Sequence, residues 1–100
     1  MRIRFEDKEL QRLAEDSSFH SKRWGPEIVR AFRRKIQLLL DAEDERDLRA
    51  LKSLRLEQLK GDRRGTYSIR VNKQFRLVMR FESEEDGRLV IVLEMVDYHH

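Results

Sequence analysis

The chain has 100 residues, a formal net charge of +3 and 41% charged residues, which suits a single globular domain over residues 1–100 and leaves no room for a large cofactor-binding half. It contains no cysteine, so disulfides, thiolate catalysis and cysteine-based zinc sites are excluded. Its longest apolar run, Leu89–Leu93, is too short to span a membrane. The first residues lack the apolar core of a secretory signal, so we expect a cytoplasmic protein.

The first half of the chain predicts one short strand and two helices. Residues 1–5 alternate between apolar and basic side chains, as a strand does, and residues 6–16 carry apolar side chains at helical spacing. An irregular connection follows over residues 17–25. Pro26 suits the first turn of the main helix, which should end near residues 42–44. One face of this helix is apolar, and we expect its basic residues to be solvated: Arg30, Arg33, Arg34 and Lys35.

The second half predicts three strands. Residues 44–53 suit either a helical turn or an extended connection, and residues 57–65 form a loop with two glycines. From Thr66 the period becomes two, which predicts a hairpin of residues 66–71 and 75–81, a turn over 82–88 and a last strand reaching about Tyr98. The order β-α-α-β-β-β indicates an α+β domain, with a mostly antiparallel sheet and two helices packed on one face.

Strand alternation assigns side chains to the two faces of this sheet. The face under the helices should hold Tyr67, Ile69, Phe75, Leu77, Met79, Leu89, Ile91 and Leu93. The opposite, open face should hold Ser68, Arg70, Arg76 and Arg80.

The segment from Leu54 to Phe81 is strongly basic. Between positions 60 and 80 there is one acid, Asp62, and seven bases, a local charge of +6: Lys60, Arg63, Arg64, Arg70, Lys73, Arg76 and Arg80. Basic side chains held on a sheet indicate a surface for a phosphate polyanion, and arginine on a free face binds phosphate oxygens in bidentate fashion. For Arg70 and Arg80, an exposed arginine that serves only solubility is an equal alternative to phosphate binding. For Arg76 we favour a functional role.

Two histidines close the chain, His99 and His100, next to Asp97 and Tyr98. Histidine is the side chain best suited to exchange protons near neutral pH, although a frayed chain end is the alternative. We take His20, in the irregular connection, as structural or exposed. The histidines lack a third ligand at recognisable spacing, so we expect no metal and no cofactor.

Three motifs in order carry a resemblance to a known family. The loop pattern L-x-x-L-K-G-x-x-x-G-x-x-S-I-R, the following N-x-x-F-R-L and the terminal D-Y-H closely resemble the HigB toxins of the RelE superfamily, over roughly residues 54–99. The resemblance implies a small α+β domain with a curved sheet. It also implies a ribosome-dependent endoribonuclease that cuts mRNA in the ribosomal A site, without a metal. The implied partner is a helix-turn-helix antitoxin, HigA, through which alone the toxin would act on DNA.

The resemblance also implies roles for individual residues. Lys60 matches the catalytic lysine of the L-K-G motif, Arg76 the arginine of the following strand, and Tyr98 and His99 the terminal pair. Asp97 matches an acid that some members use.

Glu57 departs from HigB members that carry histidine at this position, and it resembles the general base of YoeB-type relatives. The base is therefore Glu57 with His99 as the acid, or the two roles are exchanged. The basic residues around this set are then candidates for RNA binding: Arg63, Arg64, Arg70, Lys73 and Arg80.

A non-catalytic binding module of the same fold, or a gyrase-inhibiting toxin, is the alternative. The combination of D-Y-H with Lys60 and Arg76 argues against it, since the gyrase-directed relatives lack the terminal set. The antitoxin is expected on the connection of residues 19–24 and on the main helix, away from the basic face.

Overall fold

The computed structural model describes residues 1–97; Tyr98, His99 and His100 lie outside the described residues. The elements are β1 (Arg2–Phe5), α1 (Lys8–Glu15), α2 (Pro26–Asp41), α3 (Glu45–Ala50), the 3₁₀ turn η1 (Lys52–Leu54), β2 (Glu57–Gln58), the 3₁₀ turn η2 (Gly61–Arg63), β3 (Tyr67–Arg70), β4 (Phe75–Glu84) and β5 (Gly87–Asp97). No helix within residues 1–97 is both long and apolar enough to cross a membrane.

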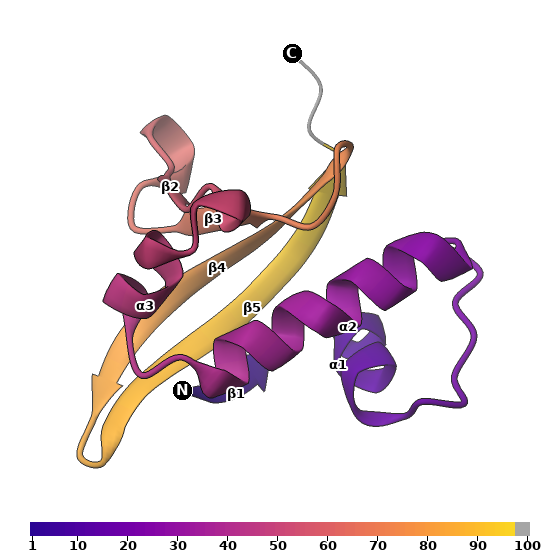
Figure 1. Cartoon of the computed structure of the whole chain (residues 1–100), viewed down its shortest axis with the longest axis horizontal. Helices are drawn as coiled ribbons and strands as arrows, with labels where there is room; N and C mark the ends of the chain where they lie inside the picture. Colours follow the sequence, from indigo (N-terminus) through magenta and orange to yellow (C-terminus); the bar gives the residue numbers. More distant parts are fainter. Residues whose placement is uncertain (98–100) are drawn as a thin grey trace.

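The five strands form one sheet in the order β1-β5-β4-β3-β2. β1 runs parallel to β5, and the other neighbours are antiparallel. Figure 1 shows β4 and β5 as a long curved ribbon with α1 and α2 beside it. The predicted α+β class and element order are confirmed. The structure adds the short strand β2, and residues 44–53, for which the sequence allowed a helical turn or an extended connection, are mostly helical. Asp44 begins α3 because its carboxylate accepts from the Arg46 backbone N–H at 2.9 Å.

Local contacts fix where the two longer helices begin and end. Asp7 caps α1 by accepting from the Leu10 backbone N–H at 3.0 Å, and Pro26 occupies the first position of α2, as predicted. The Arg33 Nε of α2 donates to the Leu13 carbonyl at 2.8 Å, so this arginine joins the two helices rather than standing in solvent. The nitrogen of Met1 donates to the carbonyls that end α2: Leu39, Leu40 and Ala42.

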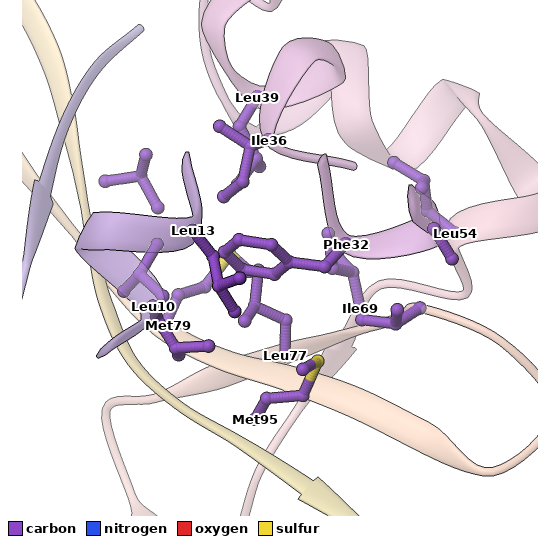
Figure 2. Packing of buried hydrophobic residues seen from close by; sticks show 14 of the residues in the cluster. Leu10, Leu13, Phe32, Ile36, Leu39, Leu54, Ile69, Leu77, Met79 and Met95 are labelled. Carbon is purple, nitrogen blue, oxygen red and sulfur yellow. The ribbon is translucent and has the colours of Figure 1, made fainter. Parts of the chain in front are cut away.

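The core lies between α1, α2 and one face of the sheet. Phe32 is fully buried, and Figure 2 shows its ring surrounded by side chains from both helices and from the strands, including Leu10, Leu13 and Leu77. Tyr67 and Phe81 make an edge-to-face pair on the same face, with ring centroids 5.3 Å apart. The two helices therefore cover one face, as the sequence predicts.

The predicted orientation of β5 is wrong. Val90, Val92 and Met95 join the core under the helices, whereas Leu89 and Ile91 are buried on the other face, with Ile91 opposite Arg80.

A β-bulge at Leu93 returns β5 to the predicted orientation by Met95, which faces the helices. Val78 is opposite Glu94 and Met79 is opposite Val92, which leaves Leu93 as the extra residue. The predicted turn of residues 82–88 is also too long, because β4 reaches Glu84 and β5 begins at Gly87.

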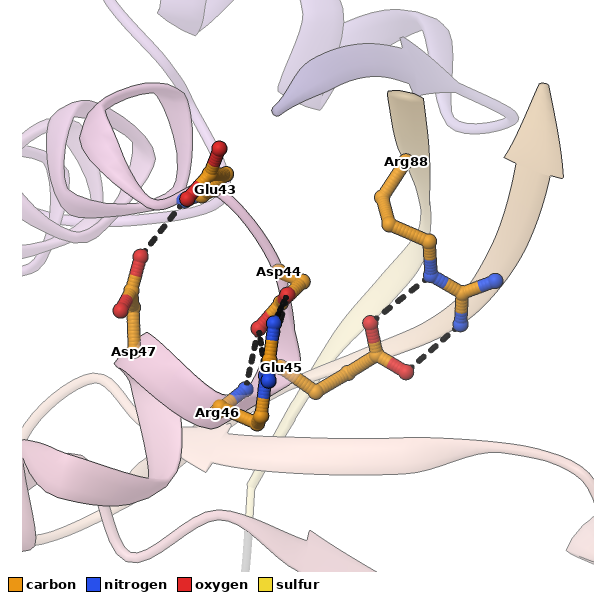
Figure 3. A network of polar contacts seen from close by, with 6 residues as sticks. All are labelled: Glu43, Asp44, Glu45, Arg46, Asp47 and Arg88. Atoms are coloured by element: carbon orange, nitrogen blue, oxygen red, sulfur yellow. Dashed lines mark hydrogen bonds and ion pairs between the residues drawn. The ribbon is translucent and has the colours of Figure 1, made fainter. Parts of the chain in front are cut away.

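An ion pair attaches α3 to β5. Arg88 Nε lies 2.9 Å from Glu45 Oε1 and Arg88 Nη2 lies 2.6 Å from Glu45 Oε2, a bidentate arrangement that Figure 3 shows beside the Asp44–Arg46 contact. Both side chains of the pair are only about a quarter exposed, at 23% and 28%. The hydrogen bond from Arg88 holds the pKa of Glu45 below its ordinary value.

We predict that Glu45→Gln destabilises the protein by about 1 kcal/mol at about pH 7, which lowers Tm by roughly 4–8 °C in a domain of this size. Because the pKa of Glu45 is lower in the folded state, its stabilisation is present above the pKa of the unfolded chain. That stabilisation disappears as the pH falls through the folded pKa. Thermal unfolding of both proteins from about pH 7 down to about pH 3 should therefore show the two curves converging in acid.

Glu85→Gln in the exposed β4–β5 turn is the matched control, with an expected change within about 0.5 kcal/mol at either pH. A Glu45→Gln deficit that persists unchanged in acid would mean that packing, and not charge, is what the variant lost.

Candidate functional site

The site is built around the buried guanidinium of Arg76. Although β4 directs this side chain to the face away from the helices, it is only 7% exposed, and Ser68 beside it is 1% exposed. Arg76 Nε donates to Ser68 Oγ at 2.8 Å, and its Nη2 donates to the carbonyls of Arg55 at 2.6 Å and Ser68 at 3.1 Å. The prediction that Ser68 and Arg76 lie on an open face is therefore wrong, because neighbouring main chain and side chains enclose them.

Glu57 stands at the rim of this buried arginine. The short strand β2 places Glu57 opposite Ser68, so its carboxylate Oε2 lies 3.6 Å from Arg76 Nη2. The Glu57 side chain is 51% exposed against 8% for Arg76. The structure thus brings two of the predicted site residues together. The Glu57 carboxylate faces solvent, and the Arg76 guanidinium is held beneath it.

Lys60 lies in the loop that leaves β2. The ladder continues through a Leu59 N–H···O=C Thr66 bond of 2.9 Å, and the chain then turns at Gly61, whose φ of 67° favours glycine. Lys60 is exposed at this turn. Arg63 in the same loop pairs with Glu94 at 2.6 Å, while Arg64 is exposed.

The register of the sheet shows which face this loop lies on. Glu57, Ser68, Val78 and Glu94 are successive cross-strand partners from β2 to β5. Because cross-strand partners share a face, the Arg63–Glu94 pair lies on the same face as the Glu57–Arg76 pair. The loop that carries Lys60 is thereby tied to the face that holds Arg76.

The end of β5 reaches the same region. Val96 is opposite Arg76, and Asp97 follows it, accepting from Gln74 Nε2 at 2.9 Å. Asp97 is opposite Phe75, which packs against the core, so its strand position is on the helix-facing side of the sheet and not on the face of Arg76. The predicted site residues Tyr98 and His99 follow directly but lie outside the described residues, as does His100.

The remaining predicted RNA-binding residues divide: Arg70 on β3 is the cross-strand partner of Arg76, whereas Arg80 is paired with carboxylates. Arg80 is held by Glu6 at 3.1 Å and by Glu82 at 3.7 Å. Arg70 and Lys73 instead line a hollow at the β3–β4 turn. Reasoning from the sequence also missed Arg55 as the residue whose carbonyl holds Arg76; its left-handed backbone, with φ of 48° and ψ of 55°, has no signal in the sequence.

The arrangement suits proton transfer next to a fixed positive charge. A carboxylate that is half exposed is accessible to a hydroxyl group, and a guanidinium enclosed by protein acts more strongly on charge that develops nearby than one in water.

Comparisons with known proteins agree with this fold. A family model described as the RelE-like toxin of the type II toxin–antitoxin system HigB matches residues 3–99. The chain is 40% identical to Toxin HigB-1 of Vibrio cholerae serotype O1 over 81% of this chain and 84% of that protein. It is 32% identical to an uncharacterised protein of Haemophilus influenzae over 90% and 88%.

Two solved structures share the architecture. The YoeB/ParE toxin from Agrobacterium tumefaciens superposes with a TM-score of 0.59 at 18% identity, over 99% of this chain and 100% of that one. A chain of the RelBE2 toxin–antitoxin complex of Mycobacterium tuberculosis gives a TM-score of 0.50 at 18% identity, over 97% and 96%. The fold is that of the RelE superfamily of toxins. The chain belongs to the HigB family of RelE-like toxins of type II toxin–antitoxin systems.

We predict that Ser68→Ala lowers the free energy of unfolding by about 1–3 kcal/mol, because it removes the hydroxyl acceptor from a buried guanidinium. Chemical denaturation with urea measures this change. Ser17→Ala is the control, since Ser17 is exposed in the α1–α2 connection, and its effect should stay within about 0.5 kcal/mol. Equal stability of the two variants would show that the hydrogen bond from Arg76 to the Ser68 hydroxyl does not stabilise the fold.

Proposed function

We propose that this toxin is a ribosome-dependent endoribonuclease that cleaves mRNA in the ribosomal A site. The observation that carries the proposal is the Glu57–Arg76 pair, a half-exposed carboxylate 3.6 Å from a nearly buried guanidinium. Membership in the HigB family supports the same activity. The substrate is a phosphodiester of RNA, because the reaction uses the ribose 2′-OH as its nucleophile.

The cleavage proceeds by internal attack. A base, Glu57 or His99, removes the proton of the 2′-OH, and the 2′-oxygen forms a bond to the adjacent phosphorus. The bond from phosphorus to the 5′-oxygen breaks as an acid, His99 or Glu57, supplies a proton to that oxygen. The products are a 2′,3′-cyclic phosphate and a 5′-hydroxyl. The bonds and protons of this scheme balance without a metal ion, so we propose metal-independent chemistry.

The cations stabilise the charge that gathers on the phosphoryl oxygens. Lys60 is exposed on the loop and is free to approach the phosphate, while Arg76 acts from its buried position beneath Glu57. Tyr98 stacks on a base or orients the substrate, and Asp97 orients His99 or contacts a base edge. Arg63, Arg64, Arg70, Lys73 and Arg80 supply attraction for the RNA backbone.

The partners follow from the same proposal. The toxin acts on the ribosome and its mRNA, and a helix-turn-helix antitoxin of the HigA type neutralises it. Through that antitoxin the complex acts on DNA. The antitoxin surface that fits best is the α1–α2 connection with α2, because it lies on the helical side of the sheet, away from Glu57 and Arg76.

We predict that His99→Ala and Glu57→Gln each slow single-turnover cleavage on programmed ribosomes by at least ~100-fold, the size of one proton-transfer contribution. Lys60→Ala should slow it by about 10²–10³-fold, since it removes one electrostatic contact to the developing oxyanion. Toxin that has been treated with EDTA and then freed of it should cleave mRNA on programmed ribosomes at the unmodified rate.

Matched controls are present in the chain. His20→Ala, Glu85→Gln and Lys22→Ala remove the same side-chain types from exposed positions outside the site, and each should cleave at the unmodified rate. If the unmodified toxin leaves ribosome-bound mRNA intact and inhibits gyrase instead, the nuclease proposal is wrong.

A further inference from the structure

A second basic surface lies beside the site already described. An open hollow of about 580 Å³ is formed where α2, η1 and the β3–β4 turn meet. Its lining holds five basic residues and no acidic one; the lining residues are Lys35, Lys52, Ser53, Arg55, Arg70, Val71, Asn72 and Lys73. The five cations come from positions 35 to 73, so the fold, and not a run in the sequence, brings them together.

Within residues 1–97, no carboxylate neutralises the charge in this hollow. Within residues 1–97, the arginines of the sheet face pair with carboxylates: Arg63 with Glu94, Arg76 with Glu57, and Arg80 with Glu6. By contrast, none of the five cations of the hollow makes an ion pair with a carboxylate in that same part of the chain. The hollow therefore has a local charge of +5 that an external anion would satisfy.

Two of the five cations have defined surroundings, Arg70 through a hydrogen bond and Lys35 through partial burial. Arg70 Nε donates to the Asn72 carbonyl at 3.2 Å, and Asn72 Oδ1 in turn accepts from the backbone of Gln74 at 2.9 Å and Phe75 at 2.7 Å. Lys35 is half-buried, and burial, together with the charges of Arg34 and Arg70, lowers the pKa of its ammonium group. An anion in the hollow would relieve the repulsion among these side chains.

Arg55 connects this hollow to the candidate active site. Its carbonyl accepts from Arg76 at 2.6 Å, while its side chain lines the hollow. Its left-handed backbone, with φ of 48°, disfavours any residue with a Cβ by about 1–2 kcal/mol. Glycine would remove that strain but would also remove the guanidinium, so this position combines an unfavourable backbone conformation with a positive charge.

We propose that this hollow binds backbone phosphates of RNA. The inference rests on the proposed RNA substrate, and it adds three residues that the sequence did not indicate: Lys35, Lys52 and Arg55. Arginine makes bidentate contacts with carboxylates as well as with phosphates, so the choice of RNA phosphate over an acidic peptide follows from the proposed RNA substrate. This RNA is either mRNA next to the scissile bond or ribosomal RNA.

Binding of a fluorescein-labelled 12-nucleotide single-stranded RNA, followed by anisotropy against salt concentration, tests the proposal without any cleavage step. Lys52→Ala combined with Lys73→Ala should weaken binding roughly tenfold at about 0.1 M salt. It should also reduce the slope of log K against log[salt] by about 1.4, or about 0.7 for each lost phosphate contact. Lys8→Ala combined with Lys22→Ala removes the same net charge from exposed positions elsewhere and should leave the slope unchanged.

Arg55→Gly separates charge from folding. Because glycine adopts the left-handed conformation freely, this variant should keep or raise Tm and yet weaken RNA binding by roughly threefold to tenfold. The same variants tested on vacant ribosomes identify the source of the phosphate. A loss on the oligonucleotide alone assigns the hollow to the mRNA strand, because vacant ribosomes carry no mRNA. A loss on ribosomes alone assigns it to folded ribosomal RNA, and a loss on both means that the hollow accepts the backbone of either; each of these outcomes supports the proposal.

Equal RNA affinity and slope for the hollow variants and the Lys8/Lys22 control on both RNAs would overturn the inference, even if the toxin cleaves mRNA as proposed. Weakened binding of polyglutamate without weakened binding of RNA would also overturn it, in favour of an acidic protein segment. A toxin that binds RNA through the hollow but cuts nothing on the ribosome would instead defeat the proposed function and leave this inference standing.

Discussion

The burial of the Arg76 guanidinium is the constraint on which the rest of the site depends. An enclosed charge is destabilising by several kcal/mol unless hydrogen bonds and an opposite charge surround it. Here Ser68 on β3 and the carbonyl of Arg55 after η1 supply the acceptors, and Glu57 on β2 supplies the charge. These three groups come from separate elements, so one arginine organises the short strand, the turn before it and the centre of the sheet. The two-residue strand β2 is held by its pairing with β3 and by the Leu59–Thr66 bond, and its Glu57 adds the contact with Arg76.

Much of the fold follows from periodicity. Three patterns each predict a single structure, and each prediction is confirmed. They are the apolar stripe of α2, the proline at the first position of α2, and the alternation that assigns side chains of β3 and β4 to two faces. β5 is different because residues 89–93 are continuously apolar, and such a run carries no information about which face is which. Both faces bury part of it, with Val90 and Val92 under the helices and Leu89 and Ile91 opposite. The bulge at Leu93 then reverses the parity before Met95, and a single chain offers no way to locate such an insertion.

The sequence indicates candidate site residues, whose roles stay predictions, but it does not indicate their contacts. Motifs in order indicate Glu57, Lys60 and Arg76 together, since they lie close along the chain. The partner of Arg80 is Glu6, 74 residues away, and no local pattern anticipates that this arginine is neutralised. The surroundings of Lys35 are likewise set by residues distant in the sequence. Helical periodicity places it on the outer face of α2 and predicts a solvated lysine, yet the fold brings it to a hollow that it shares with the β3–β4 turn.

Charge pairing separates two kinds of basic surface on this small toxin. Where a carboxylate lies beside an arginine, as with Glu57 and Arg76, the pair is neutral overall and attracts a polyanion weakly, but it places a proton acceptor next to a positive charge. Where cations gather without carboxylates, as around Arg55, the field extends further into solvent, within the Debye length of about 8–10 Å at ordinary salt concentrations. In the proposed nuclease the pair would serve proton transfer and the unpaired cluster would serve capture of the strand. Arg55 joins them through one residue, because its carbonyl holds the arginine of the pair while its guanidinium belongs to the unpaired cluster.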